Sequence, residues 1–318
     1  MAKRPRNRHL TAHIDRELTL TPDLLAILAI FDGSDAYEYL PRNWAEAFAP
    51  YNPKTGKLKH PERFRHYLGE LTCTFNNVKH PLLGRFTLSR TDSFYEMMKY
   101  YRTPAGDRLA AVHGRPKLTY HQSKEPDLHQ LFGCLRRASL ELGIRADPNF
   151  SLDGPREILS HERMGSHDPK SPFLFHTTLG RYSPDDKPLV VRRRAPRESK
   201  LLLFEDDRSS EGTVPSDTST RLDEKFAKIV EVWRRRLFEH KYGHKAALLL
   251  FCTIGEIRAR NVRDYLHRRF GPMSYVLIKA FPEFKYLMKT ITVTTKAWDT
   301  PWMRPGYPDY SLITLSEA

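Results

Sequence analysis

The sequence predicts a mixed α/β protein, α+β overall, in which a mainly helical N-terminal part precedes a domain built on a mixed sheet. Up to residue 112, apolar residues recur at helical spacing and are interrupted by one pair of short extended stretches. From residue 173 onward, continuous apolar runs at 201–204 and 246–252 alternate with helical segments, as strands buried on both faces do. A length of 318 residues leaves room for two such domains.

The charge balance points to a polyanionic partner. Lys and Arg number 52 and Asp and Glu number 38, which gives a formal net charge of +14. Such an excess favours nucleic acid, although a basic protein can also be merely soluble or bind a membrane surface. With 40% hydrophobic and 11% aromatic residues, the chain can build cores and is not disordered as a whole.

The cysteines and the apolar runs bear on the cellular location. Cys73, Cys134 and Cys252 lie far apart without CxxC spacing, so we expect neither a disulfide framework nor a zinc site. The basic start of the chain leads into no apolar segment, and the longest apolar runs are far shorter than a bilayer requires. We therefore expect a cytoplasmic protein without membrane contact.

Four helices and a hairpin are predicted in the N-terminal part. Thr21, Pro22 and Asp23 are typical of a helix start, further helices are expected at 40–48 and from Pro61, and a capped helix opens at Thr103. Extended stretches at 85–89 and 95–102, separated by turn formers, predict the hairpin. This order is typical of a winged helix-turn-helix. We expect a flexible basic arm at 1–16, a winged-helix DNA-binding domain at 17–112, a linker at 113–126 and a second domain at 127–318.

The third helix would be the recognition helix of such a domain. Phe64, Tyr67, Leu68 and Leu71 form its core stripe, which leaves its cations for the DNA groove and phosphates. The alternative is that these are ordinary solvated cations. The candidate nucleic-acid contacts are Lys57, Lys59, Arg63, Arg65, Arg85, Arg90 and Arg208.

The second domain is predicted to alternate strands and helices. A helix is expected at 127–142 and an irregular polar stretch at 151–171. Strands are then expected at 173–175, 189–191, 201–204, 246–252, 275–281 and 291–295, with helices at 222–240 and 256–269.

Acidic residues cluster at the ends of these strands. Asp185 precedes one strand, and Glu205 and Asp207 end the next. Carboxylates on neighbouring strands can converge on Mg²⁺ or Mn²⁺, which would activate water and offset charge on a phosphate. This is the layout of the PD-(D/E)xK nucleases and predicts a restriction-endonuclease-like domain. Asp207 stands where the lysine of that motif belongs, and Lys225, which borders the core-facing side of the following helix, is the candidate replacement.

The segments LLLFEDDRSSEGT, RLDEKFAKIVEVW and AALLLFCTIGEIRARNVRDYL resemble, in this order, the core of the replication-relaxation family. The resemblance implies a winged helix joined to a nuclease-like domain in a protein of plasmids and mobile elements. It places Glu205, Asp207 and Arg208 at the E-x-D-R positions, Asp185 at the PD position and Lys225 at the lysine of the helix. Asp206 departs from the family pattern, which has an apolar residue there.

Three functional interpretations remain open from the sequence. The first is a DNA-binding protein of plasmid replication or DNA relaxation whose nuclease-like domain nicks or clamps DNA with Mg²⁺ or Mn²⁺. The second is a non-enzymatic transcriptional or copy-number regulator with a degenerate site, whose second domain serves homodimer formation or contact with a partner. The third is an RNA-processing nuclease, which the basic charge does not exclude. Plain surface acidity paired with nearby arginines is the alternative for the acidic cluster.

Overall fold

The chain divides into two units in the computed structural model, which describes residues 11–31, 39–49, 61–86, 99–113, 128–160, 173–207, 219–285 and 291–315. Unit 1 comprises Met1–Ala138 and Tyr286–Val293, and unit 2 comprises Ser139–Lys285 and Thr294–Ala318. The sequence predicted that the second domain begins at residue 127. Unit 1 instead extends to Ala138 and includes the first part of the long helix Leu128–Ala146. The later segment also returns to unit 1, where the carbonyl of Ile291 accepts hydrogen bonds from Asn43 (2.8 Å) and the Trp44 indole (3.1 Å).

Three helices of unit 1 begin where the sequence predicts them, whereas the helix expected at 40–48 begins only at Arg42, because Leu40 and Pro41 form a strand. Thr21 caps the first helix by accepting a hydrogen bond from the backbone N–H of Leu24 (3.3 Å), and Thr103 caps the fourth by accepting one from Gly106 (3.2 Å). The helices are α1 (Pro22–Ile30), α2 (Arg42–Ala47), α3 (Pro61–Leu71) and α4 (Pro104–Val112).

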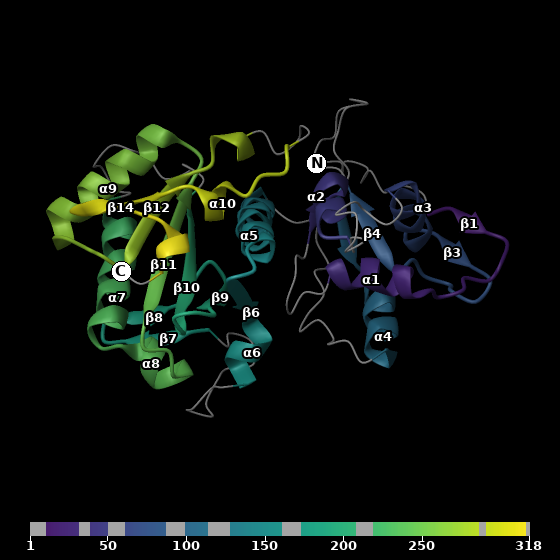
Figure 1. Ribbon diagram of the computed structural model, residues 1–318, viewed down its shortest axis with the longest axis horizontal. Helices are drawn as coiled ribbons and strands as arrows, with labels where there is room; N and C mark the ends of the chain where they lie inside the picture. The colour runs from purple at the N-terminus through teal and green to yellow at the C-terminus, as the bar shows by residue number, and fades with distance from the viewer. Residues whose placement is uncertain are drawn as a thin grey trace, which may run out of the picture. The chain divides into compact units, whose positions relative to one another are not determined.

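A three-stranded sheet accompanies these helices (Figure 1). Strands β4 (Leu83–Phe86) and β5 (Lys99–Arg102) pair antiparallel, as the predicted hairpin requires, and β2 (Leu40–Pro41) pairs with the other side of β5. The pattern did not predict β2, because two residues are too few to show strand alternation. The tip of the predicted hairpin, at 87–98, lies outside the described residues.

Residues 11–16 do not behave as the flexible arm that the sequence predicts. Strand β1 (His13–Ile14) pairs in parallel with β3 (Thr74–Phe75), directly after α3. Arg16 forms an ion pair with Glu70 of α3, and its guanidinium lies over the Phe75 ring at 5.4 Å. The prediction was wrong for this stretch, because one ion pair and one aromatic contact dock a polar segment that has no apolar periodicity. Residues 1–10 lie outside the described residues.

Unit 2 is built on a seven-stranded mixed sheet in the order β14-β13-β12-β11-β10-β9-β6 (Figure 1). The three central strands β10, β11 and β12 run parallel, whereas β9 and β13 run antiparallel to their inner neighbours. The strands are β6 (Phe150–Asp153), β9 (Asp186–Arg193), β10 (Glu198–Asp207), β11 (Ala247–Thr253), β12 (Val276–Ala280), β13 (Trp302–Arg304) and β14 (Tyr307–Tyr310). The chain is therefore a mixed α/β protein, as predicted.

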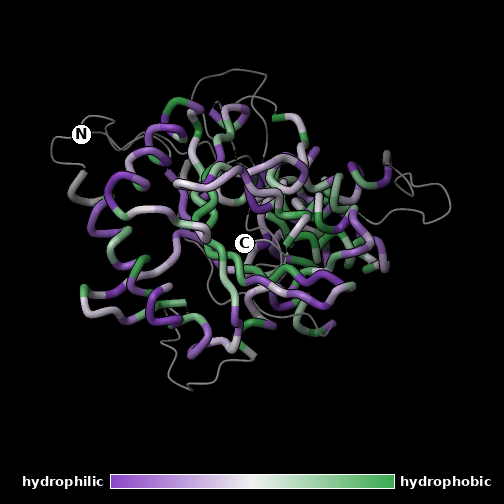
Figure 2. Tube along the Cα trace, turned by 60° about the vertical axis from the view of Figure 1, so that its left-hand side comes forward, coloured by the Kyte–Doolittle hydropathy of each residue, from purple (hydrophilic) through white to green (hydrophobic). Residues whose placement is uncertain are grey.

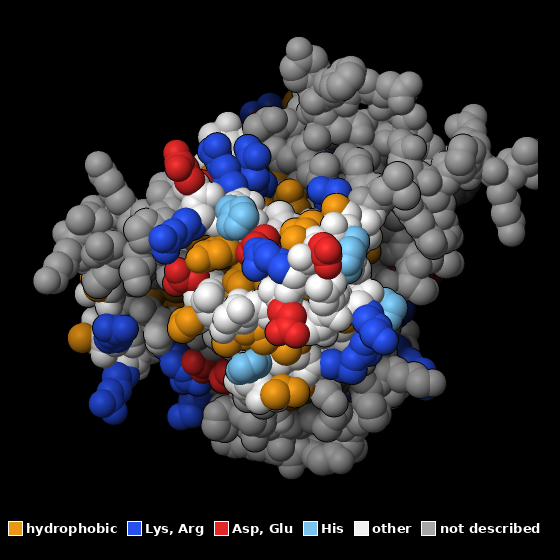
Figure 3. All heavy atoms as spheres, turned by 90° about the vertical axis from the view of Figure 1, so that its right-hand side faces the viewer, with side chains coloured by type: hydrophobic (Ala, Val, Ile, Leu, Met, Phe, Trp, Pro, Cys, Tyr) orange, Lys and Arg blue, Asp and Glu red, His pale blue; other side chains and the backbone are white. Residues whose placement is uncertain are grey.

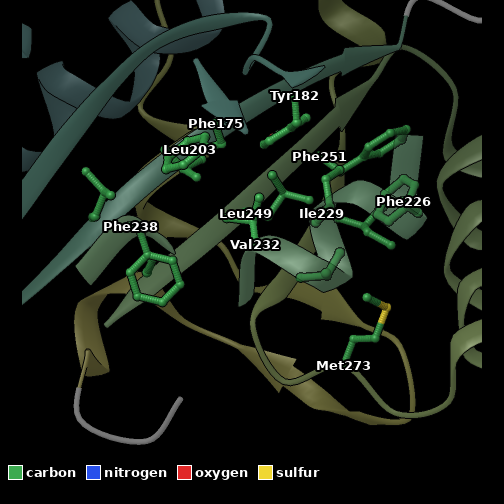
Figure 4. Close-up of a cluster of buried hydrophobic side chains, with 14 of the residues drawn as sticks. Phe175, Tyr182, Leu203, Phe226, Ile229, Val232, Phe238, Leu249, Phe251 and Met273 are labelled. Carbon is green, nitrogen blue, oxygen red and sulfur yellow. The ribbon is translucent and has the colours of Figure 1, made fainter. Parts of the chain in front are cut away.

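One face of this sheet is covered by three helices, α7 (Ser219–Arg234), α8 (Leu237–Tyr242) and α9 (Glu256–Phe270). Hydrophobic residues gather along the strands (Figure 2), and those of the covered face interdigitate with the helices (Figure 4). Leu203, Leu249, Phe226 and Ile229 are among the fully buried residues of this core. Burial on this scale is the main force that holds the sheet and helices together.

On the other face lies α10 (Lys296–Asp299), which is fixed by a buried lysine of β12. Lys279 donates to the carbonyls of Lys296 (2.9 Å) and Thr300 (2.5 Å), and its Nζ lies 4.4 Å from the Trp302 ring centroid. Burial lowers the pKa of Lys279 to about 7. Helix α5 (Leu128–Ala146) packs against α10 where Gly143 leaves room for Trp298.

Three sequence expectations for unit 2 were wrong. The predicted helix at 222–240 is broken between α7 and α8, where Arg236 adopts a left-handed conformation (φ 50°). The predicted strand at 291–295 is irregular, because the carbonyl of Ile291 bonds to α2 instead of to a neighbouring strand. The stretch predicted as irregular from 151 contains most of β6 and the helix α6 (Pro155–Ser160).

A small hairpin precedes β9 and packs against α7. It consists of β7 (Phe175–Thr177) and β8 (Gly180–Tyr182), which pair antiparallel. None of the helices in the described parts of the chain is long and apolar enough to span a membrane.

Candidate functional site

The carboxyl end of β10 brings two acidic positions together. Because β9 runs antiparallel to β10, the start of β9 lies beside the end of β10. Asp185, directly before β9, donates its backbone N–H to the carbonyl of Phe204 (2.9 Å), and its carboxylate accepts the backbone N–H of Asp206 (3.0 Å). These bonds hold Asp185 against the strand that carries Glu205.

Lys225 of α7 joins the two carboxylates. Its ammonium donates to Asp185 Oδ2 at 2.9 Å and forms an ion pair with Glu205 Oε2. The hydroxyl of Tyr182, at the end of β8, donates to the other oxygen of the same carboxyl, Glu205 Oε1, at 2.7 Å. We refer to Asp185, Glu205 and Lys225 as the Asp185–Glu205–Lys225 cluster.

The cluster is buried on one side and open on the other. The side chain of Glu205 is fully buried, whereas those of Asp185 and Lys225 are 39% and 33% exposed. A solute therefore reaches the cluster from the side of Asp185 and Lys225. The apolar environment behind Glu205 strengthens its electrostatic interactions with the two charged neighbours.

The pKa values of the cluster are displaced in opposite directions. Burial raises the pKa of Glu205 well above its usual range, and the neighbouring Asp185 adds to this effect. Burial also acts to raise the pKa of Asp185, but Lys225 and the hydrogen bonds to its carboxylate outweigh it and lower that pKa. For Lys225, the attraction of Glu205 and Asp185 exceeds the effect of burial and raises its pKa. In the absence of a metal ion, the geometry therefore favours a charged Asp185–Lys225 pair beside a carboxyl that readily keeps its proton.

Asp207 does not join the cluster. Its carboxylate accepts a hydrogen bond from Arg258 Nε of α9 at 2.7 Å, and both side chains are buried. Asp207 lies two residues beyond Glu205 on the same face of β10, close to the first turn of α9 rather than to α7. The predicted set of three carboxylates is thus reduced to two, and no group of three Asp, Glu, His or Cys residues is placed to hold a metal within the described ranges.

The remaining pair of carboxylates is still compatible with Mg²⁺ or Mn²⁺. Mg²⁺ keeps several water ligands and is commonly held by one or two carboxylates together with substrate phosphates. Asp185 and Glu205 supply hard oxygen ligands, and one of them is open to solvent. A cation held there would compete with Lys225 for the same oxygens, because the ammonium already contacts both carboxyl groups.

The cations predicted to contact DNA fall into two groups. Arg63 and Arg65 are exposed on α3, one on each side of the buried stripe of Phe64, Leu68 and Leu71, whereas Arg85 of β4 is half-buried. Figure 3 looks onto the side of unit 1 that carries α3, where Lys, Arg and His side chains are spread among acidic ones. The other candidates, Lys57, Lys59, Arg90 and Arg208, lie outside the described residues.

Sequence reasoning missed two residues beside the cluster, Tyr182 and Arg258. Tyr182 stands three residues before Asp185, and a tyrosine that ends a strand next to an acidic turn is a weak signal on its own. Arg258 follows Gly255 at the start of α9, where it resembles any basic helix residue. Both became recognisable only through their partners on β10.

Comparison of the chain with models of protein families, with curated proteins and with solved structures gave no match.

Proposed function

We propose that this protein binds duplex DNA through unit 1 and hydrolyses a phosphodiester bond of that DNA at the Asp185–Glu205–Lys225 cluster of unit 2, with Mg²⁺ or Mn²⁺. One observation carries the proposal: two carboxylates and a lysine, from the start of one strand, the end of the next and the following helix, meet at one partly open place. Neither a strand ladder nor a core requires a charged cluster at this position.

The arrangement of unit 1 supports the DNA-binding half of the proposal. Three helices precede the β4–β5 strand pair and β2 completes its sheet, an order of elements that supports the winged-helix interpretation. In this interpretation α3 is the recognition helix, and Arg63 and Arg65 contact phosphates and base edges in the major groove. The docked residues 11–16 brace α3 from the side through Arg16 and Glu70.

Each residue of the cluster would have a distinct role in hydrolysis. Asp185 and Glu205 would hold the cation, which when bound lowers the pKa of water and offsets charge on the phosphate. Lys225 supplies a fixed positive charge beside these carboxylates, where it stabilises the negative charge that develops on the phosphate oxygens. The apolar core behind Glu205 excludes water on that side and keeps these interactions strong.

The biological role that we propose follows from the resemblance of the strand β10, helix α7 and strand β11 segments to the replication-relaxation family. In this role, the protein acts in the cytoplasm on plasmid or mobile-element DNA, where nicking relaxes supercoils. The nuclease-like interpretation of unit 2 is consistent with its mixed sheet and with the placement of Lys225, which replaces the lysine that the motif lacks.

A second candidate function is a non-enzymatic DNA-binding regulator, with or without homodimer formation. It is favoured by the ion pair of Asp207 with Arg258, which removes the third carboxylate from the cluster. It is also favoured by Lys225, which neutralises Asp185 and Glu205 without any metal. A degenerate site would keep such a pair as a structural element.

The two candidates are separated by incubating the protein with supercoiled plasmid and Mg²⁺ or Mn²⁺. We expect nicking by the wild type, loss of nicking in Glu205→Gln, and wild-type activity in Glu198→Gln, which changes a carboxylate at the opposite end of the same strand. All three proteins should bind duplex DNA equally. If all three proteins bind DNA and none nicks it, the non-enzymatic regulator is supported. If Glu205→Gln nicks as fast as the wild type, the cluster does not take part in the reaction.

A further inference from the structure

Tyr182 is a buried tyrosine whose hydroxyl has one specific partner. Its side chain is 3% exposed, and its ring stacks on Phe175 with a centroid distance of 6.0 Å, in the core shown in Figure 4. A phenol in an apolar core needs a hydrogen-bond partner for its hydroxyl. The partner is Glu205 Oε1 at 2.7 Å, so the ring packs with the core while the hydroxyl reaches the cluster.

The hairpin that carries Tyr182 is anchored to the helix that carries Lys225. At the β7–β8 turn, the backbone N–H and the hydroxyl of Thr178 each donate to the carboxylate of Glu231 on α7 at 2.7 Å. Arg235, which directly follows α7, donates to the same carboxylate at 2.7 Å. These hydrogen bonds connect the hairpin of Tyr182 to the helix of Lys225, and the two residues contact different oxygens of Glu205.

We propose that Tyr182 is a positioning residue for Glu205, an inference that rests on the proposed function. The last torsion of a glutamate side chain is broad, so that an unrestrained carboxyl can turn either oxygen to a cation. Tyr182 occupies Oε1 and leaves Oε2 facing Lys225, so Oε2 is the oxygen that would be available to a cation. The ring itself is too deeply buried to reach a DNA phosphate, so Tyr182 acts through Glu205 and not as a nucleophile.

The substitution that isolates this role is Tyr182→Phe, which removes one hydroxyl and keeps the stacked ring. Loss of a hydrogen bond to a metal-binding carboxylate typically costs about 10- to 100-fold in metal affinity or activity. The matched control is Tyr275→Phe, because Tyr275 also packs against the core of unit 2, stacked on Trp233, but lies just before β12, at the opposite end of the central strands from Glu205.

Two measurements are made on the full-length wild type and both variants. Mn²⁺ binding without DNA is followed by electron paramagnetic resonance, and plasmid nicking is followed under single-turnover conditions over a range of Mn²⁺ concentrations. We expect Tyr182→Phe to bind Mn²⁺ about 10- to 100-fold more weakly or to nick more slowly by that factor. Duplex affinity should equal that of Tyr275→Phe, and a merely structural role of Tyr182 would leave Mn²⁺ binding unchanged.

The outcomes separate this inference from the proposed function. If the wild type nicks and Tyr182→Phe does so with the same rate and Mn²⁺ dependence, the positioning role is wrong and the nuclease stands. If no protein nicks but Tyr182→Phe binds Mn²⁺ more weakly than the wild type, hydrolysis is wrong and the positioning of Glu205 stands. If the wild type neither binds Mn²⁺ nor nicks, both the proposed hydrolysis and the positioning role of Tyr182 are wrong.

Discussion

Lys225 carries the charge balance of the cluster. It is the cation that faces both Asp185 and Glu205, and Glu205 is fully buried. Removing one partner of a buried ion pair leaves the other uncompensated, which typically costs roughly 3–5 kcal/mol when both are fully buried. Lys225 and Asp185 are partly solvated, so the cost here is smaller.

We predict that Lys225→Met destabilises the protein by about 2 kcal/mol at neutral pH, since water screens part of the interaction. Differential scanning calorimetry of the full chain checks this value. Added Mn²⁺ should then raise the melting temperature of Lys225→Met more than that of the wild type, because the metal replaces the missing ammonium. Lys228→Met, one turn along α7, is the control and should show neither effect. Equal responses of both variants to Mn²⁺ would show that Lys225 and the metal do not share a site.

At the residue scale, the sequence predicted the members of the cluster but not their surroundings. Asp185 and Glu205 stand at strand ends and Lys225 borders a helical stripe, which are local patterns that a sequence displays. Tyr182 and Arg258 lie 23 and 51 residues from the carboxylates that they bind. Because spacing along the chain does not encode such pairs, the sequence could not show that Asp207 belongs to Arg258.

Among the elements, the β7–β8 hairpin depends on one carboxylate. Hydrogen bonds from the Thr178 backbone, the Thr178 hydroxyl and Arg235 lower the pKa of Glu231 to about 2. A carboxyl whose pKa is lower in the folded than in the unfolded protein stabilises the fold above the unfolded pKa, and this contribution disappears as the pH falls toward the folded pKa.

We therefore predict that the wild type loses stability as the pH falls from about 4.5 to about 2, because Glu231 becomes protonated. Glu231→Gln has no carboxylate at this position and should not show this part of the loss. At pH 7 the Gln variant should be the less stable protein, and the difference should shrink as the pH falls. Urea unfolding at pH 7, 4 and 3 measures it. A difference that stays constant over this range would mean that Glu231 holds the hairpin by its shape and not by its charge.

Two glycines of unit 1 should respond in opposite directions to the same substitution. A Cβ on Gly106 of α4 would lie 2.2 Å from the carbonyl oxygen of Leu82, whereas a Cβ on Gly69 of α3 would meet nothing within 4 Å. Gly106→Ala should therefore destabilise the protein by about 1–3 kcal/mol through overpacking. Gly69→Ala should stabilise it by about 0.5–1 kcal/mol, because alanine favours the helix. Thermal unfolding checks both, and a stable Gly106→Ala would show that α4 does not pack tightly beside β4.

Element boundaries were predictable where local chemistry sets them. Thr21 and Thr103 carry capping chemistry that the sequence displays, and α1 and α4 begin directly after them. The break at Arg236 was not predictable, because the apolar stripe of α7 continues into α8 as if one helix covered both. The two-residue strand β2 exists only through pairing with the distant strand β5, and such pairing overrides local propensity.

For the whole molecule, the net charge of +14 has a measurable consequence. A protein that neutralises phosphates releases counterions, so that its affinity falls with salt at a slope of about 0.9 per neutralised phosphate. We predict a steep salt dependence of duplex binding, measured by fluorescence anisotropy. Replacing both Arg63 and Arg65 by Ala should reduce the slope by about 1–2 units.

The control for this measurement is Arg108→Ala, which removes an exposed cation from α4 of the same unit. We expect a smaller change than for the two arginines of α3. A slope that is the same in all variants would show that α3 does not face the DNA backbone.

The organisation of the whole chain was only partly visible in the sequence. The change from helical to strand-like patterning predicted two domains, because composition and periodicity change together there. The return of Tyr286–Val293 to unit 1 was not predictable, since it depends on a carbonyl of Ile291 that meets Asn43 and Trp44 far earlier in the chain. Long-range contacts of this kind produce no periodic pattern in the amino-acid sequence.

We propose that water, and not a protein side chain, breaks a DNA phosphodiester bond at the Asp185–Glu205–Lys225 cluster. The most direct test is to incubate wild-type protein, duplex DNA and Mn²⁺ in ¹⁸O-labelled water and to examine the products by mass spectrometry. The account predicts one labelled oxygen in the terminal phosphate of each cut strand, and none in a reaction with Glu205→Gln. Intact DNA, or a cut strand joined covalently to the protein, would contradict it.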